Sequence, residues 1–170
     1  MGNYWINQRV RDKNAFLKAF KRRLQDIYLQ KWQEDVERTS GERLFKHIKT
    51  EFKYEPYLDI LNKTLRIAMT KIRLSSHAFF IERGRWENIN RDARICNICR
   101  VLESEFHCMA ICPRFVNERR GLLNVVLRER PCMDEFIKMF KSHDVIDMKN
   151  LGLLCFKIIL EYNRQLYIED

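Results

Sequence analysis

The stretch that decides the organisation of this chain is RICNICRVLESEFHCMAICPRF, residues 94–115. Three of its four cysteines and its one histidine have the spacing C-x2-C-x7-H-x4-C, which offers four soft or borderline metal ligands. This ligand set is typical of a closed, tetrahedral structural zinc site. The sequence therefore predicts a bound Zn ion, and the four expected ligands are Cys96, Cys99, His107 and Cys112.

The spacing of these ligands has a mechanical basis. A C-x2-C turn directs two thiolates at one ion, and residues 100–106 let the chain return with the other two ligands. Ser104 is a good N-cap for a short helix that carries His107. On a continuous helix, His107 and Cys112 would differ by about 140° in azimuth. Because Pro113 disfavours helical geometry at the residue before it, we expect Cys112 to leave the helix and turn toward the metal.

Two other interpretations of the cysteines remain open. Cys108 lies four residues before Cys112, so on a continuing helix the two would share a face, and Cys108 could replace His107 as the fourth ligand. The cysteines could also be ordinary buried residues, although a C-x2-C with a correctly spaced histidine and cysteine is more specific than scattered cysteines. Three closely placed thiolates favour a structural role over a catalytic metal with an open position.

The composition of the whole chain indicates a mostly α protein. Of its 170 residues 46% are hydrophobic and 12% aromatic, which is enough for one compact domain with its own core. Five glycines and three prolines are too few for a turn-rich β-sandwich or barrel. We therefore expect an irregular helical bundle, in which a CCHC zinc knuckle is inserted as a short hairpin plus a short helix.

Apolar positions that recur every three or four residues predict the helices, and the first three of these should pack together. The expected order is a long amphipathic helix from its N-cap Asp12 to Arg38, ended by Ser40-Gly41; a helix over 44–52, ended before Pro56; a helix over 57–72; a loop over 84–94; a helix over 115–127; a short helix opened by Pro131; and a last helix capped by Asp147. Within one domain, we divide the chain into a helical region with a basic loop (1–95), the zinc knuckle (96–113) and C-terminal helices (114–170).

Charge and hydropathy restrict the classes of partner. The net charge is +9, and residues 63–130 carry 14 basic against 7 acidic side chains, an excess that attracts phosphate-bearing partners. The longest uncharged apolar stretch, Leu151–Phe156, is far shorter than the roughly 20 residues that a membrane span requires. The first residues do not have the pattern of a signal peptide. We therefore expect an intracellular protein of the nucleus or cytoplasm, without membrane binding and with reduced cysteines.

Five motifs, in this order, carry a family resemblance: TKIRLSSH at 70–77, IERGRW at 81–86, RICNIC at 94–99, ESEFH at 103–107 and CPRF at 112–115. Together they resemble the zinc-binding region downstream of reverse transcriptase in LINE-type (non-LTR) retrotransposon polyproteins, over about residues 42–122. The resemblance implies a nucleic-acid-contacting module, with a reverse transcriptase as partner or within a parent polyprotein. The chain has no Asp-Asp pair to hold two Mg²⁺ ions, so we expect no polymerase and no other enzyme activity.

Arginines around the knuckle are the candidate contacts to RNA, single-stranded or structured, or to target DNA, because guanidinium groups bind phosphates and stack on bases. The candidates are Arg73, Arg83, Arg85, Arg91, Arg94, Arg100 and Arg114. Trp86 and Phe106 could supply a stacking face for unpaired bases. The alternatives are that both aromatic residues pack in the core and that the arginines are ordinary solvated charges.

Two alternative functions remain open. The chain could be a protein-interaction adaptor, whose first helix docks on a partner while zinc only staples the fold, or an inert relic of a retroelement. The other conspicuous side chains have simpler interpretations. We expect His77 to be a capping or packing residue and Cys155 to lie in the core, whereas Cys132 has no partner that the sequence identifies.

Overall fold

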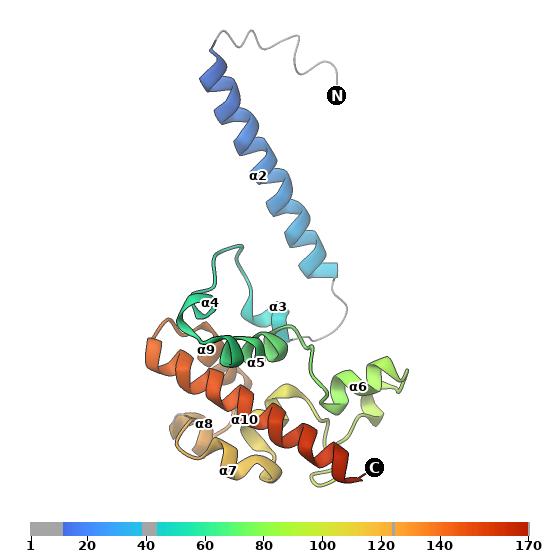
Figure 1. Ribbon diagram of the computed structural model, residues 1–170. Coiled ribbons are helices and arrows are strands. Elements are labelled where there is room, and N and C mark those ends of the chain that lie inside the picture. The colour runs from blue at the N-terminus through green and yellow to red at the C-terminus, as the bar shows by residue number, and fades with distance from the viewer. Residues whose placement is uncertain (1–11, 39–43, 124, 170) are drawn as a thin grey trace. The chain divides into compact units, whose positions relative to one another are not determined.

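The computed structural model describes residues 12–38, 44–123 and 125–169, and these are mostly helical (Figure 1). By its contacts the chain divides into two compact units, Met1–Gly41 and Glu42–Asp170. The expected break at Ser40-Gly41 lies outside the described residues. Among the described helices, none combines the length and the apolar character needed to cross a membrane.

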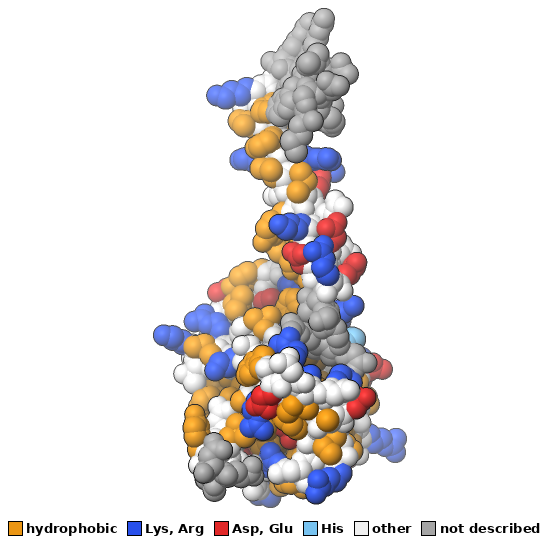
Figure 2. Space-filling view, turned by 90° about the vertical axis from the view of Figure 1, so that its right-hand side faces the viewer, with side chains coloured by type: hydrophobic (Ala, Val, Ile, Leu, Met, Phe, Trp, Pro, Cys, Tyr) orange, Lys and Arg blue, Asp and Glu red, His pale blue; other side chains and the backbone are white. Residues whose placement is uncertain are grey.

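The described part of the first unit is one helix, α2 (Lys13–Arg38). Asp12 caps it as predicted, because its carboxylate accepts a hydrogen bond of 2.8 Å from the backbone amide of Asn14. The apolar residues spaced four apart from Phe16 to Val36 do not form one face, since each step of four advances about 40° around a helix. None of the described residues of α2 is buried, and hydrophobic side chains lie at its surface along its length (Figure 2). The expectation that this helix packs with the next two is not confirmed.

The second unit is built from short helices around one long one, α10 (Val145–Glu169), which packs along α5 (Lys63–Arg73) (Figure 1). A Cβ at Gly152 would lie 2.9 Å from Leu61 Cδ1, so the glycine allows α10 to approach the segment before α5 closely. The remaining helices are α3 (Leu44–Ile48), α4 (Tyr57–Ile60), α6 (Phe80–Trp86), α7 (Val116–Arg119), α8 (Val125–Glu129), α9 (Met133–Lys141), the 3₁₀ helices η1 (Arg91–Ala93) and η3 (Pro113–Phe115), and the π-helix η2 (His107–Ile111). The described residues contain no strand, only one isolated β-bridge.

Several helix boundaries differ from those predicted, and capping side chains account for two of the differences. The helix expected over 57–72 is split because Leu61 is extended and the side chain of Asn62 caps α5. The last helix begins at Val145, because Asp144, not Asp147, accepts hydrogen bonds from the first free backbone amides. The helix expected over 44–52 ends at Ile48, the loop expected over 84–94 contains the end of α6 and η1, and the helix expected over 115–127 is divided among η3, α7 and α8.

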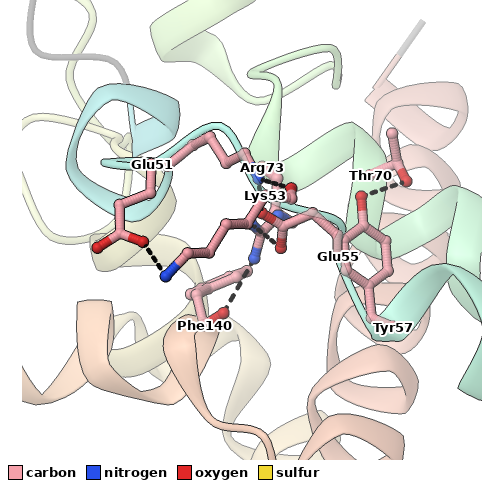
Figure 3. Close-up of polar contacts among 8 residues, drawn as sticks. Glu51, Lys53, Glu55, Tyr57, Thr70, Arg73 and Phe140 are labelled. Carbon is pink, nitrogen blue, oxygen red and sulfur yellow. Dashed lines mark hydrogen bonds and ion pairs between the residues drawn. The ribbon is translucent and has the colours of Figure 1, made fainter. Parts of the chain in front are cut away.

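A partly buried polar network holds the segment between α3 and α4 (Figure 3). The guanidinium of Arg73 donates to the Glu55 carboxylate at 2.7 Å and to the carbonyl oxygen of Phe140 at 2.9 Å. It also lies 5.0 Å from the ring centroid of Tyr57, whose hydroxyl is 3.1 Å from that of Thr70. Polar contacts thus help to hold α4, α5 and α9 together.

Candidate metal centre

One potential ligand atom from each of Cys96, Cys99, His107 and Cys112 lies within 4.8 Å of the other three. The Cys112 sulfur is 3.9 Å from that of Cys96 and 3.8 Å from that of Cys99. A disulfide would need a distance of about 2.05 Å. A tetrahedral ion with metal–sulfur bonds of about 2.3 Å would place its sulfurs about 3.8 Å apart. The cluster therefore has the dimensions of a four-coordinate metal site.

His107 supplies a second indication of a metal. Both of its ring nitrogens are buried, and neither has a hydrogen-bond partner among the described residues. A buried polar atom left without a partner typically destabilises a fold by about 1–3 kcal/mol, so it needs an explanation. Burial lowers the pKa of the imidazole, which keeps it in the neutral form that a metal ligand requires. A bound ion would satisfy one of the two nitrogens.

The surroundings of Cys99 and Cys112 favour the protonated thiol, and a bound cation would reverse this preference. Burial raises the pKa of the Cys112 thiol to about 12, and burial also raises the pKa of Cys99. A bound cation stabilises the thiolate and releases the thiol proton. Metal affinity at this site should therefore fall as the pH falls, because protons compete for the sulfurs.

A short hairpin carries the first two cysteines. Ile95 and Leu102 form an antiparallel bridge, and the Cys96 amide donates to the Val101 carbonyl at 2.8 Å. The Arg100 amide donates to the Cys96 carbonyl at 2.9 Å and completes the turn. Arg100 has φ 59°, in the left-handed region where side chains other than glycine are strained. The turn thus directs both sulfurs to one point at the expense of one strained residue.

The helix that carries His107 begins as predicted and continues differently. Ser104 caps it, because its hydroxyl accepts from the His107 amide at 3.2 Å. The next turn is a π-helix, in which the Cys112 amide donates to the His107 carbonyl at 2.7 Å, an i→i+5 bond. The wider turn brings two residues five apart toward the same side. Cys112 then leaves the helix with ψ 125°, as the following Pro113 favours.

Cys108, the alternative fourth ligand, lies outside the cluster. It is buried in the hydrophobic core with 1% of its surface exposed. Burial raises the pKa of its thiol well above the ordinary value. The π-turn is the reason, because Cys108 and Cys112 would share a face only on a continuous α-helix. Cys155 is also buried in the core, as expected.

Glu105 links the segment that carries His107 to Ser75 and His77. Its carboxylate accepts from the Ser75 hydroxyl at 2.8 Å and lies 3.0 Å from Nε2 of His77. Nδ1 of His77 accepts from the Phe79 amide at 3.3 Å, and its buried ring packs on that of Phe79 at a centroid distance of 4.2 Å, so of the two expected roles, capping and packing, the structure shows packing. Burial alone would raise the pKa of Glu105, but His77 and the other hydrogen bonds hold it below its usual range. The carboxylate is therefore an acceptor for both neighbours.

Glu103 links the segment to α10. Its carboxylate accepts from the Phe80 amide at 2.9 Å, at the start of α6, and from the hydroxyl of Tyr162. Sequence reasoning missed both glutamates. The only available signal was the position of two acidic residues between metal ligands in a basic part of the chain, which does not by itself indicate burial.

Two of the seven candidate arginines, Arg73 and Arg94, make their contacts within the fold. Arg73 is 3% exposed and occupied by the network between α3 and α4 described above. Arg94 donates from Nε and Nη2 to the Ile89 carbonyl and from Nη1 to the Ile81 carbonyl, at 2.7–2.9 Å. Backbone carbonyls thus accept hydrogen bonds from all three nitrogens of Arg94, which leaves few N–H groups to bind a phosphate.

The other five candidates reach the surface to different degrees. Arg91 and Arg100 are exposed. Arg83 and Arg85 are each a little over one-third exposed and pair with Glu87 at 3.7 Å and Glu82 at 2.6 Å. Arg114 is half-buried, donates to the Asn97 side chain and lies 5.8 Å from the ring centroid of Phe115.

The two candidate stacking residues separate. Trp86, at the end of α6, has 58% of its surface exposed. Phe106 is half-buried, with its ring edge-on to Phe136 at a centroid distance of 5.3 Å. Trp86 is thus available for stacking on a base, whereas Phe106 packs against the core. For Phe106 the packing alternative is the one that the structure bears out.

Arg119 is a further residue that sequence reasoning missed. Its guanidinium donates to the carbonyls of Cys108 and Ile111 at 3.4 Å, at the end of η2 where carbonyls lack helical partners. Burial lowers its pKa. A cation at a helix C-terminus is a recognised stabilising arrangement.

Comparison with known proteins gives no further assignment: no family model matches the chain, and no curated protein or solved structure matches it. The case for function therefore rests on the geometry of the cluster and of the surface around it.

Proposed function

We propose that this protein is a nucleic-acid-binding module stapled by one zinc ion, of the kind found downstream of reverse transcriptase in LINE-type retrotransposon polyproteins. The observation that carries the proposal is the four-ligand cluster, with its sulfur separations of 3.8 and 3.9 Å and its two unpartnered imidazole nitrogens. That cluster lies within the most basic segment of the chain, residues 63–130. A stapled loop region that carries the exposed Arg91 and Arg100 is a suitable surface for a polyanion.

Zinc is the metal that this donor set favours. Three thiolates and one imidazole are soft or borderline ligands, which select zinc over magnesium or calcium. Four protein ligands complete a tetrahedral shell and leave no position for a substrate. The proposed role of zinc is therefore structural, and the module itself is proposed to have no catalytic activity.

The proposed contact surface combines α6 with the hairpin. α6 contributes the exposed ring of Trp86 and the partly exposed Arg83 and Arg85. The hairpin contributes the exposed Arg100 and the side chain of Ile98, which is 54% exposed. An exposed indole stacks on unpaired bases, whereas guanidinium groups bind phosphates. Single-stranded RNA or DNA is therefore the favoured ligand over a regular duplex.

The first experiment measures binding of the zinc-loaded protein to a fluorescent 12-nucleotide single-stranded RNA and to a DNA duplex at two salt concentrations. We expect the RNA to bind more tightly and its affinity to fall steeply with salt. Trp86→Ala should weaken RNA binding by about 5- to 150-fold, since stacking contributes about 1–3 kcal/mol per base. Arg83→Ala with Arg85→Ala should reduce the salt slope by about 1.4 units, or about 0.7 for each lost phosphate contact.

The matched control is Lys63→Ala with Lys71→Ala, which removes the same charge from the exposed side of α5. It should change the affinity less than twofold. Equal losses in both double variants would mean that only net charge matters, and no RNA binding at low salt would overturn the proposal.

A protein-interaction adaptor is the second candidate, and one observation favours it. On α2, Leu17, Phe20, Leu24 and Ile27 follow the 3-4-3 spacing of a helix seam and are each 41–50% exposed. Such a seam is a common docking surface for another helix. Deleting residues 1–41 would abolish partner capture under this hypothesis and leave RNA binding by the second unit intact under the first.

A further inference from the structure

A hollow of about 370 Å³ lies beside the metal centre, where η2, α7 and α8 meet. Its apolar lining includes Ile111 from η2, Val116 from α7 and Leu123 from the turn that follows. The side chains of Ile111 and Val116 are 44% and 55% exposed, so apolar surface faces solvent here. The volume is at the lower end of the range of small-ligand sites, about 300–1,000 Å³, which suits one ring system.

The charged lining of this hollow is purely basic. Arg119, Arg120 and Arg128 line it, and no carboxylate does so among the described residues. The side chains of Arg120 and Arg128 are exposed and make no hydrogen bond or ion pair with any residue that the structure describes. Arg119 differs, because it is held against the end of η2. As far as the described residues go, two guanidinium groups therefore have no partner and can bind an anion above an apolar floor.

We propose that this hollow takes one unpaired base of a single-stranded nucleic acid, while Arg120 and Arg128 bind the phosphates on either side of it. The inference rests on the proposed function and adds a second point of contact, separate from Trp86 and the hairpin. Apolar side chains bind the face of an extruded base, and the planar fork of arginine matches a phosphate. Because arginine also pairs with carboxylates, an acidic peptide is the competing occupant in the test below.

The wall of the hollow depends on the metal centre. Ile111 is the last residue of η2, and the Arg119 guanidinium is bonded to the carbonyl oxygens of Cys108 and Ile111. η2 is the π-turn that brings His107 and Cys112 to the same side. Loss of the ion should therefore disturb the hollow, and chelation should remove its contribution to binding along with the staple.

The test compares fluorescent oligo(dT) of 12 nucleotides with an abasic strand of the same length, which keeps the phosphates and lacks the bases. Arg120→Ala with Arg128→Ala should lower the affinity for oligo(dT) about tenfold and reduce the salt slope by about 1.4 units. Val116→Glu should weaken oligo(dT) more than the abasic strand, because it places a carboxylate on the floor where the base would lie. Each variant is first checked for bound zinc and an unchanged melting temperature.

Lys63→Ala with Lys71→Ala is the charge-matched control, and it should change the affinity less than twofold. If it weakens oligo(dT) as much as the arginine pair does, the hollow is not a site. Tighter binding of a labelled Glu-Leu repeat peptide than of oligo(dT), lost in the arginine variant, would assign the hollow to an acidic peptide and overturn the proposal. If Trp86→Ala weakens oligo(dT) while the arginine variant does not, the hollow fails and the proposed function stands. If the unmodified protein binds no strand, both fail.

Discussion

Two regions of the second unit are ordered in different ways. Where α5 and α10 meet, the buried side chains are apolar, among them Ile72, Leu154 and Ile158. Residues 94–115, by contrast, combine a cluster of candidate metal ligands with buried glutamates, a π-turn and a residue at positive φ. The first region is stabilised by the apolar surface that it removes from water, and the second by specific hydrogen-bond and ligand partners. Substitutions that remove a metal ligand or a hydrogen-bond partner should therefore destabilise residues 94–115 far more than the contact between α5 and α10.

The largest expected effect is that of removing the proposed zinc ion. Cys96→Ser with Cys99→Ser should abolish zinc binding and reduce the free energy of unfolding by several kcal/mol, since metal binding is linked to folding. In hydrogen exchange, the amide of Cys112 should lose protection before that of Leu154 on α10. Cys132→Ser, at an exposed cysteine outside the cluster, is the control and should change neither zinc content nor melting temperature. Loss of protection in both regions together would mean that they are one cooperative unit.

A smaller effect is expected where the two regions are joined. Tyr162 on α10 donates its hydroxyl to the buried carboxylate of Glu103. Tyr162→Phe should reduce stability by about 1–3 kcal/mol, because a buried charged acceptor loses a donor. Tyr167→Phe on the same helix is the control. Tyr167 is 83% exposed, so removing its hydroxyl should leave the stability unchanged. Chemical denaturation measures both, and equal values would show that the bond to Glu103 contributes nothing.

Gly84→Ala tests the structural assignment of Arg94. A Cβ at Gly84 would lie 2.9 Å from Cγ and 3.0 Å from Cδ of Arg94, whose guanidinium is fixed by backbone carbonyls. We expect a loss of about 1–2 kcal/mol, as for other overpacked sites. In an Arg94→Ala background the same substitution should be nearly neutral. A penalty that persists there would have to come from the backbone of α6 and not from the arginine.

The smallest expected effect is a gain in stability at the hairpin. Arg100→Gly relieves the strain of φ 59°, which should stabilise the protein by about 0.5 kcal/mol after the added freedom of the unfolded chain is counted. Arg100→Ala removes the same charge without relieving the strain, so it should not stabilise. Under the proposed function, both variants should weaken RNA binding equally. A higher melting temperature for the alanine variant would show that the charge, and not φ, matters.

The same two regions explain how much the sequence could predict. Helical class, the long helices and the four-residue ligand set follow from periodicity and spacing, because such signals are local. Capping by Asp12 and Ser104 was also predictable, since a cap involves neighbours in the chain. The break at Leu61 and the cap at Asp144 were missed because several candidate caps stood close together.

The seven candidate arginines show why the rest of the site could not be predicted from the sequence. Seven of them had the same residue type and a similar place in the sequence, yet Arg73 and Arg94 are fixed by carbonyl groups of Phe140, Ile81 and Ile89. Such partners are brought together only by the folded chain. Composition gives the number of charges in a region, whereas tertiary structure decides how many of them remain available to a ligand.

The π-turn at η2 also bears on how such a site tolerates changes in chain length. An ordinary α-helix would bring a histidine and a cysteine to one face when they are four residues apart. Here they are five apart, and the i→i+5 bond between Cys112 and His107 absorbs the additional residue. A chain with one residue fewer between these ligands could thus hold the same ion on a regular helix. Single-residue insertions and deletions at this point would interconvert two backbone forms of one site, so ligand spacing alone underestimates which sequences can build it.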